Sequence, residues 1–237
     1  MPDQPDSAGT GRTAAIIVAA GSSRRMTGID KLLEPLGGRP IVAHSLDAFA
    51  RHPGIDEIVV VVSESNREAI AELADSVAGG RTAVVLGGRR RRDSVLNGLQ
   101  ALTAACEYVV VHDAARPFVD AAMIDAAVAG AREVGAALCA IPVSDTVKRA
   151  EPSGRVSSTV TREGLWLAQT PQAFRRDLLL RAHETIDLDV TDDAALIELL
   201  GEPVKLVMGS RRNIKVTLPE DLALAEALLA AAEGEAS

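Results

Sequence analysis

The residues that follow the first apolar segment have the types that bind anions. After Ala19 the chain continues AGSSRRM and reaches Lys31, so two glycines, two serines and three cations come in close succession. Backbone N–H groups of small residues approach phosphates closely, and Arg25 and Lys31 would neutralise them. The segment lacks the three glycines of a dinucleotide motif, and Leu32 stands where a P-loop has Ser or Thr. We expect an anion site of another kind.

A second loop, VLGGRRRRDSVLNGL, has two glycines and four consecutive arginines ahead of a segment with helical spacing. We expect that helix to begin at Asp93 or Ser94, where its N-terminus would attract phosphate or carbonyl oxygens. A run of four arginines is more often a solvated basic surface than a binding site. The sequence therefore predicts one functional arginine and three that are mostly incidental.

A third loop, VVVHDAARPF, places Asp113 at the end of an apolar run, with Arg116 three residues later. Mg²⁺ typically takes one or two carboxylates together with substrate phosphates, which makes Asp113 a candidate metal ligand. The alternative for Asp113 is a helix or turn cap. We expect His112 to lie in the core or to support the site from behind.

These loops need a scaffold that brings them together. Short β-branched apolar runs predict buried strands, and the segments between them have helical spacing, with Ser65, Asp93 and Asp120 as the expected caps. Alternating strands and helices predict an α/β fold: a three-layer α/β/α sandwich with a mostly parallel, Rossmann-like sheet. Ligands bind such sheets beyond the carboxyl ends of the strands, which selects residues 20–31, 87–94 and 112–118. The predicted strands cover residues 13–19, 57–62, 82–86, 108–111, 136–142 and 204–208.

Composition narrows the class of protein. The 237 residues are 47% hydrophobic and 2% aromatic, and their net charge of −8 argues against a nucleic-acid partner, which requires basic surface and aromatic stacking. We expect no membrane span and no signal peptide. Cys106 and Cys139 are expected to be core thiols in a reducing compartment, so we predict a cytoplasmic protein. Residues 1–12 are predicted to be a disordered tail before a single domain, 13–237.

The strand and helix pattern breaks at residue 143. Residues 143–165 alternate polar and β-branched types around a Pro-Ser-Gly turn, which predicts a protruding two-stranded arm. Because an isolated hairpin is marginally stable in water, we expect the arm to pack on a second subunit.

No Ser-His-Asp or Cys-His arrangement is evident in the sequence. A phosphate monoester has a second pKa of about 6, so as a nucleophile it needs no general base at neutral pH. It needs cations that bring two anionic reactants together and stabilise charge at phosphorus. The expected anion is therefore a nucleoside triphosphate.

The chain resembles the 2-C-methyl-D-erythritol 4-phosphate cytidylyltransferases of the non-mevalonate isoprenoid pathway over nearly everything after residue 12. The resemblance implies transfer of CMP from CTP to methylerythritol phosphate in a Mg²⁺-dependent homodimer, with release of pyrophosphate. The matching motifs, in order, are AAGSSRRM with Lys31, GGRRRRDSV, VHDAARP, DTVKRA, TREGLWLAQTPQAF, TDDAALIE and NIKVTLPEDLALAE.

The resemblance also assigns residue roles. Arg25, Lys31 and Lys215 would be catalytic, and Asp113 would hold the metal. The residues implied to bind the nucleotide are Ala19, Ala20, Gly21, Ser23, Gly88, Ser94 and Ala114. Those implied to bind the second substrate are Asp113, Arg116, Thr146, Arg162, Thr170 and Thr191, of which Thr146 and Arg162 would reach the neighbouring subunit.

Several positions depart from the family's pattern. Ser23 replaces a frequent glycine, Asp30-Lys31-Leu32 replaces Pro-Lys-Gln, and Arg89 replaces an acidic residue. Two alternative functions remain open at this point. One is a cytidylyltransferase for another polyol phosphate, such as ribitol 5-phosphate; the other is a nucleotide-binding module without turnover. Arg162 with Gly-Leu-Trp favours the methylerythritol substrate.

Overall fold

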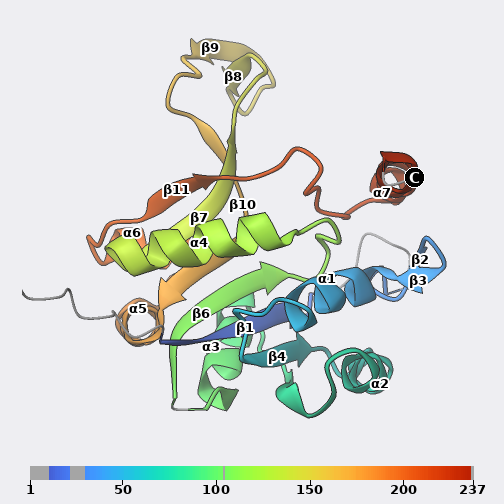
Figure 1. Cartoon of the computed structure of the whole chain (residues 1–237). Helices are drawn as coiled ribbons and strands as arrows, with labels where there is room; N and C mark the ends of the chain where they lie inside the picture. The colour runs from blue at the N-terminus through green and yellow to red at the C-terminus, as the bar shows by residue number, and fades with distance from the viewer. Residues whose placement is uncertain (1–10, 22–29, 104, 236–237) are drawn as a thin grey trace, which may run out of the picture.

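Seven strands form the central sheet in the computed structural model, which describes residues 11–21, 30–103 and 105–235 (Figure 1). Neighbouring strands are parallel except for β10, which is antiparallel to both β6 and β7. The mostly parallel sheet predicted from the sequence is therefore confirmed. The strands lie in the order β11 (Lys205–Met208), β7 (Ala136–Pro142), β10 (Trp166–Arg175), β6 (Cys106–Asp113), β1 (Arg12–Ala19), β4 (Glu57–Val62) and β5 (Thr82–Leu86).

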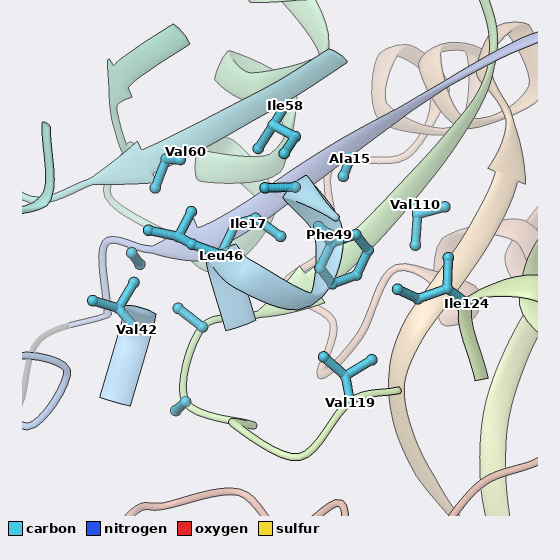
Figure 2. Packing of buried hydrophobic residues seen from close by; sticks show 14 of the residues in the cluster. Ala15, Ile17, Val42, Leu46, Phe49, Ile58, Val60, Val110, Val119 and Ile124 are labelled. Atoms are coloured by element: carbon cyan, nitrogen blue, oxygen red, sulfur yellow. The ribbon is translucent and has the colours of Figure 1, made fainter. Parts of the chain in front are cut away.

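Helices cover both faces of this sheet. Alternate residues of β1 separate the two layers, because Ile17 packs toward α1, α2 and α4, whereas Ile16 packs toward α3, α5 and α6. Figure 2 shows the first of these cores, to which Leu46 and Phe49 of α1 and Val60 of β4 all belong. The helices are α1 (Ile41–Ala50), α2 (Arg67–Ala78), α3 (Arg91–Ala101), α4 (Ala121–Val134), α5 (Arg176–Thr185), α6 (Ala194–Leu199) and α7 (Pro219–Glu235), with a 3-10 turn η1 (Gly79–Arg81).

The predicted caps have mixed outcomes. Asp120 accepts a hydrogen bond from the Met123 N–H at 2.8 Å and caps α4, as expected. Asp93 lies inside the first turn of α3 rather than at its start, and accepts from the Arg90 N–H. Ser65 is not the cap of α2, because Asn66 occupies that position.

Two short sheets lie outside the central one. Strands β2 (Pro35–Leu36) and β3 (Arg39–Pro40) form a small hairpin before α1. Strands β8 (Val147–Ala150) and β9 (Val156–Val160) pair with each other around Gly154, whose φ of +81° favours glycine, and Figure 1 shows them at the top, away from the central sheet. The predicted two-stranded hairpin is thus present. Within the described residues, none of the helices combines the length and apolarity that crossing a bilayer requires.

Candidate active site

The loops at the carboxyl ends of the strands surround a pocket of about 360 Å³. Its walls come from β1, β6, the loop between β5 and α3, and the segments around Lys31 and Lys215. The three loops selected from the sequence therefore meet at one place, as the topology requires. The described lining residues are Val18, Ala20, Gly21, Lys31, Leu32, Gly88, Arg89, Arg90, Arg91, Ser94, Asp113, Ala115, Lys215 and Thr217.

Asp113, the last residue of β6, places its carboxylate between two cations from distant parts of the chain. Lys215 Nζ lies 2.7 Å from Asp113 Oδ2, and Arg91 Nη2 lies 3.3 Å from Asp113 Oδ1. Burial by itself raises the pKa of this carboxyl, but Arg91, Lys215 and Arg116 together hold it well below its ordinary value. Asp113 is therefore an anion throughout the neutral pH range.

Arg91 connects Asp113 to a second carboxylate, that of Asp193, which is completely buried. Arg91 Nη1 lies 2.6 Å from Asp193 Oδ2, and Asp193 directly precedes α6. Burial lowers the pKa of Arg91. The carboxylates of Asp193 and Asp113 raise this pKa by more than burial lowers it, so the guanidinium stays charged. One side chain thus ties together the start of α3, the end of β6 and the start of α6.

The other arginines of the run have distinct environments. Arg89 is exposed at the pocket, whereas Arg90 lies 2.8 Å from Asp93 and 2.8 Å from Asp187. These ion pairs fix the Arg90 side chain beside the pocket wall.

Arg92 is only 4% exposed and is a structural residue. Its guanidinium donates to the carbonyl oxygens of His183 at 2.8 Å, Leu188 at 3.2 Å and Ile186. The expectation that three of the four arginines are incidental is wrong. Arg90 and Arg91 form ion pairs, and the buried Arg92 binds backbone carbonyls at the end of α5.

Ser94 does not begin α3, which starts three residues earlier at Arg91. Its N–H already donates to the Arg90 carbonyl at 3.1 Å and is not available to a ligand as an end-of-helix donor. Its hydroxyl oxygen instead accepts from the Gly88 N–H at 3.1 Å. A Cβ on Gly88 would lie 2.4 Å from that of Asp93, so the turn requires glycine here. Ser94 shapes the loop and also lines the pocket.

Hydrogen bonds from buried residues next to the pocket hold Asp113 in place. The Thr170 hydroxyl accepts from the Asp113 N–H at 3.0 Å and lies 3.1 Å from His112 Nδ1. His112 is fully buried, as expected, and burial lowers its pKa to about 4. Arg116 Nη1 donates to the Asn213 carbonyl at 2.8 Å, so this part of its guanidinium binds the backbone.

The predicted residues thus fall into several groups. Seven line the pocket: Ala20, Gly21, Lys31, Gly88, Ser94, Asp113 and Lys215. Four others are adjacent to it without being among its described lining residues: the buried Ala19, Ala114 and Thr170, and the partly buried Arg116. Three are exposed elsewhere: Thr146 and Arg162 flank the β8 and β9 hairpin, and Thr191 precedes α6. Arg25 and Ser23 lie outside the described residues.

Sequence reasoning assigned no role to Asp193 or Thr217. Thr217 lines the pocket, and its N–H and hydroxyl both donate to Asp221 Oδ2 at 2.7 Å. Asp193 was visible only as one acid within TDDAALIE, and its partner Arg91 lies 102 residues away. The sequence carries no local signal for that pairing.

Asp113 is the described pocket residue that could hold a divalent cation. Among the described lining residues, Asp113 is the one carboxylate, and the described part of the chain has no group of three metal-ligating side chains. A single ionised carboxylate with substrate phosphates is an ordinary donor set for Mg²⁺.

Comparison with known proteins agrees on one family. Residues 13–231 match the family model described as IspD: 2-C-methyl-D-erythritol 4-phosphate cytidylyltransferase. Proteins of that name from Dehalococcoides mccartyi and Desulforamulus reducens are 45% and 46% identical to this chain, each over 92% of it and 96% of the relative. The crystal structure of 4-diphosphocytidyl-2C-methyl-D-erythritol synthase from Anaerococcus prevotii is 32% identical, with a TM-score of 0.83 over 93% of this chain and 97% of that one.

Proposed function

The chain belongs to the 2-C-methyl-D-erythritol 4-phosphate cytidylyltransferase family, and from this membership we propose how its pocket carries out the reaction. The enzyme transfers CMP from CTP to 2-C-methyl-D-erythritol 4-phosphate, which yields 4-diphosphocytidyl-2-C-methyl-D-erythritol and pyrophosphate. The proposals below concern the mechanism, the residues, the metal and the assembly.

One observation carries the mechanism: Lys31 and Lys215, 184 positions apart in the sequence, line the same pocket as Asp113 and the two glycine-containing loops. Two polyanions repel each other, so their reaction requires cations at the point where they meet. Lys215 is 40% exposed, so its ammonium can turn toward a ligand from its place beside Asp113.

The chemical step is an in-line displacement at the α-phosphorus of CTP. An oxygen of the methylerythritol phosphate forms the new P–O bond, the bond from the α-phosphorus to the bridging oxygen breaks, and pyrophosphate leaves with the electron pair. The attacking phosphate is already an anion, because its second pKa is about 6. No side chain has to accept a proton.

Lys31 and Lys215 stabilise the negative charge that develops at the α-phosphorus, and Arg25 is assigned to the triphosphate on the resemblance alone. Gly88 and Ser94 contact the cytosine, while Ala19, Ala20, Gly21 and Ala114 surround the nucleotide; Ser23, like Arg25, is assigned to the nucleotide on the resemblance alone. Preorganised cations in a partly enclosed pocket stabilise such a transition state better than water does.

Asp113 would hold the Mg²⁺ ion, which when bound neutralises phosphate charge. In that arrangement Arg91 keeps the Asp113 carboxylate oriented while Lys215 turns to the substrate. Removal of divalent cations with EDTA is expected to abolish turnover, and Mg²⁺ is expected to restore it.

The β8 and β9 hairpin, within residues 143–165, is proposed as a dimerisation arm that brings Thr146 and Arg162 to the neighbouring subunit's methylerythritol phosphate. Arg116, Thr170 and Thr191 would border the same substrate. The exposure of Thr146, Arg162 and Thr191 supports contacts beyond their own pocket. Arg12 belongs to β1, so the predicted disordered tail at 1–12 does not reach that residue. A disordered tail before it, a single domain from residue 13 and a cytoplasmic location stay predictions from the sequence.

Pyrophosphate release tests the assignment. Purified protein with CTP and Mg²⁺ should release pyrophosphate with methylerythritol phosphate and much less with ribitol 5-phosphate; preference for ribitol 5-phosphate would overturn the substrate. Mixing inactive Lys31→Ala with inactive Arg162→Ala subunits should restore part of the activity. No recovery, despite demonstrated subunit exchange, would refute the shared site.

A further inference from the structure

Asn66 occupies the N-cap position of α2, yet its side chain does not cap that helix. An asparagine at this position ordinarily accepts a hydrogen bond from an N–H of the first turn. Asn66 is 1% exposed, and its side-chain amide forms hydrogen bonds with Ser63, Ala19 and Asp30, all outside α2. The amide therefore connects segments outside α2 instead of capping that helix.

The Asn66 amide binds two residues beside the pocket: Ala19, which precedes Ala20, and Asp30, which precedes Lys31. Asn66 Nδ2 donates to the carbonyl oxygen of Ala19, the last residue of β1, at 3.0 Å. The same nitrogen donates to Asp30 Oδ2 at 2.6 Å, a short bond to a carboxylate. Asn66 Oδ1 accepts from the Ser63 N–H at 2.9 Å, which anchors the amide to the end of β4.

Asp30 transmits this anchoring to Lys31. Its Oδ1 accepts from the Leu32 N–H at 3.0 Å, so the carboxylate spans the backbone on both sides of Lys31. Leu32 is 2% exposed, and its carbonyl accepts from the Val42 N–H at 3.0 Å. The backbone of Lys31 is thereby fixed between Asn66 and the start of α1.

We infer that Asn66 is a positioning residue for the reaction: it binds Ala19 and Asp30 together and so directs Lys31 into the pocket. Asn66 is not among the described residues that line the pocket and acts through its neighbours. This inference rests on the proposed role of Lys31 at the α-phosphorus.

Substitution Asn66→Asp is the direct test, because it keeps the shape of the side chain and the acceptor for Ser63. It removes both N–H donors and places a second carboxylate beside Asp30. A displacement of about 1 Å at a reacting group lowers rates by roughly 100-fold, so we expect kcat for pyrophosphate release to fall by about 10- to 100-fold. Ser65→Ala is the matched control, since Ser65 is exposed in the same turn, and it should stay within about twofold of the wild type.

The decisive measurement combines Asn66→Asp with Lys31→Ala. If Asn66 acts by directing Lys31, the substitution slows the wild type but changes kcat of Lys31→Ala by less than about threefold. An equal slowing in both backgrounds would overturn the inference. Wild-type turnover by Lys31→Ala would instead refute the role of Lys31, and with it the inference.

Asp30→Asn provides a second variant in case Asn66→Asp does not fold. Asp30 is only partly buried, and its amide replacement keeps an acceptor for Asn66 while removing the charge. We expect a smaller loss of kcat, roughly threefold to tenfold, which also disappears in the Lys31→Ala background. An unchanged kcat in this variant would contradict the role of the charged bond.

Discussion

Arg92→Met tests whether an arginine within a basic run is part of the fold. The substitution keeps an apolar stem but removes the donors to the carbonyl oxygens of His183, Ile186 and Leu188. Hydrogen bonds from a charged donor contribute about 1.5–3 kcal/mol each. Leu188 is 56% exposed, so water can replace the donor there, which leaves two bonds to count.

Two bonds at the low end of that range give a loss of about 3 kcal/mol in the free energy of unfolding. The low end is appropriate because Arg92 Nε is buried without a hydrogen-bond partner among the described residues. Burying an unpaired donor costs free energy in the wild type, so removing it offsets part of the stability lost in Arg92→Met. For a domain of this size, about 3 kcal/mol lowers Tm by roughly 6–12 °C.

Thermal and urea unfolding, followed by circular dichroism, measure this effect. Arg89→Met is the matched control, because Arg89 is exposed in the same run, and its unfolding free energy should change by less than about 0.5 kcal/mol. Equal stability of Arg92→Met and Arg89→Met would refute the reasoning, and so would a more stable Arg92→Met.

Three further predictions concern the charged groups. Lys31→Ala should lower kcat, measured by pyrophosphate release, by about 100-fold or more. Its effect on CTP binding, measured by titration calorimetry, should be smaller, and wild-type turnover would contradict the prediction. Arg91→Lys should lower kcat/KM by about 10-fold, because lysine lacks the forked guanidinium that faces Asp113 with one nitrogen and Asp193 with another; rates equal to the wild type would argue against the bridge. Burial and neighbouring Arg92 and Arg91 lower the pKa of His183 from 6.5 to about 4, so the unfolded chain takes up its proton first as pH falls. The unfolding free energy should therefore decrease between pH 6.5 and about 4 by up to about 1.4 kcal/mol per pH unit from this residue. His183→Leu should reduce that slope in urea titrations, and an unchanged slope would exclude His183 as its source.

The sequence predicted most strands of the central sheet from their apolar runs. The runs at 57–62, 82–86 and 136–142 are mostly apolar, and β4, β5 and β7 have those bounds. The expected burial on both faces is wrong for β5, because it lies at the edge of the sheet and none of its residues is fully buried. The missed strand of the central sheet is β10, in which Pro171 and two glutamines interrupt the apolar pattern. Proline in a central strand argues against a strand because it has no N–H to donate, and β10 has a register shift between Ala168 and Gln172.

Site residues that lie at or after strand ends could be predicted from the sequence. Site residues whose role depends on side chains far away in the sequence could not. Asp113, Lys31 and Gly88 follow from their positions after strands, since carboxyl ends of parallel strands meet at one edge. The burial of Arg92 depends on α5, and the role of Arg91 depends on Asp193, about 100 residues further along. No local pattern reports such pairings.

The most direct test of the account is a crystal structure with Mg²⁺ and a CTP analogue that cannot be cleaved between the α- and β-phosphates. The account predicts the ammonium groups of Lys31 and Lys215 within about 3 Å of phosphate oxygens at or beside the α-phosphorus. Lysines directed into solvent, with the triphosphate bound elsewhere, would contradict the claim that cations from distant segments join two anionic substrates.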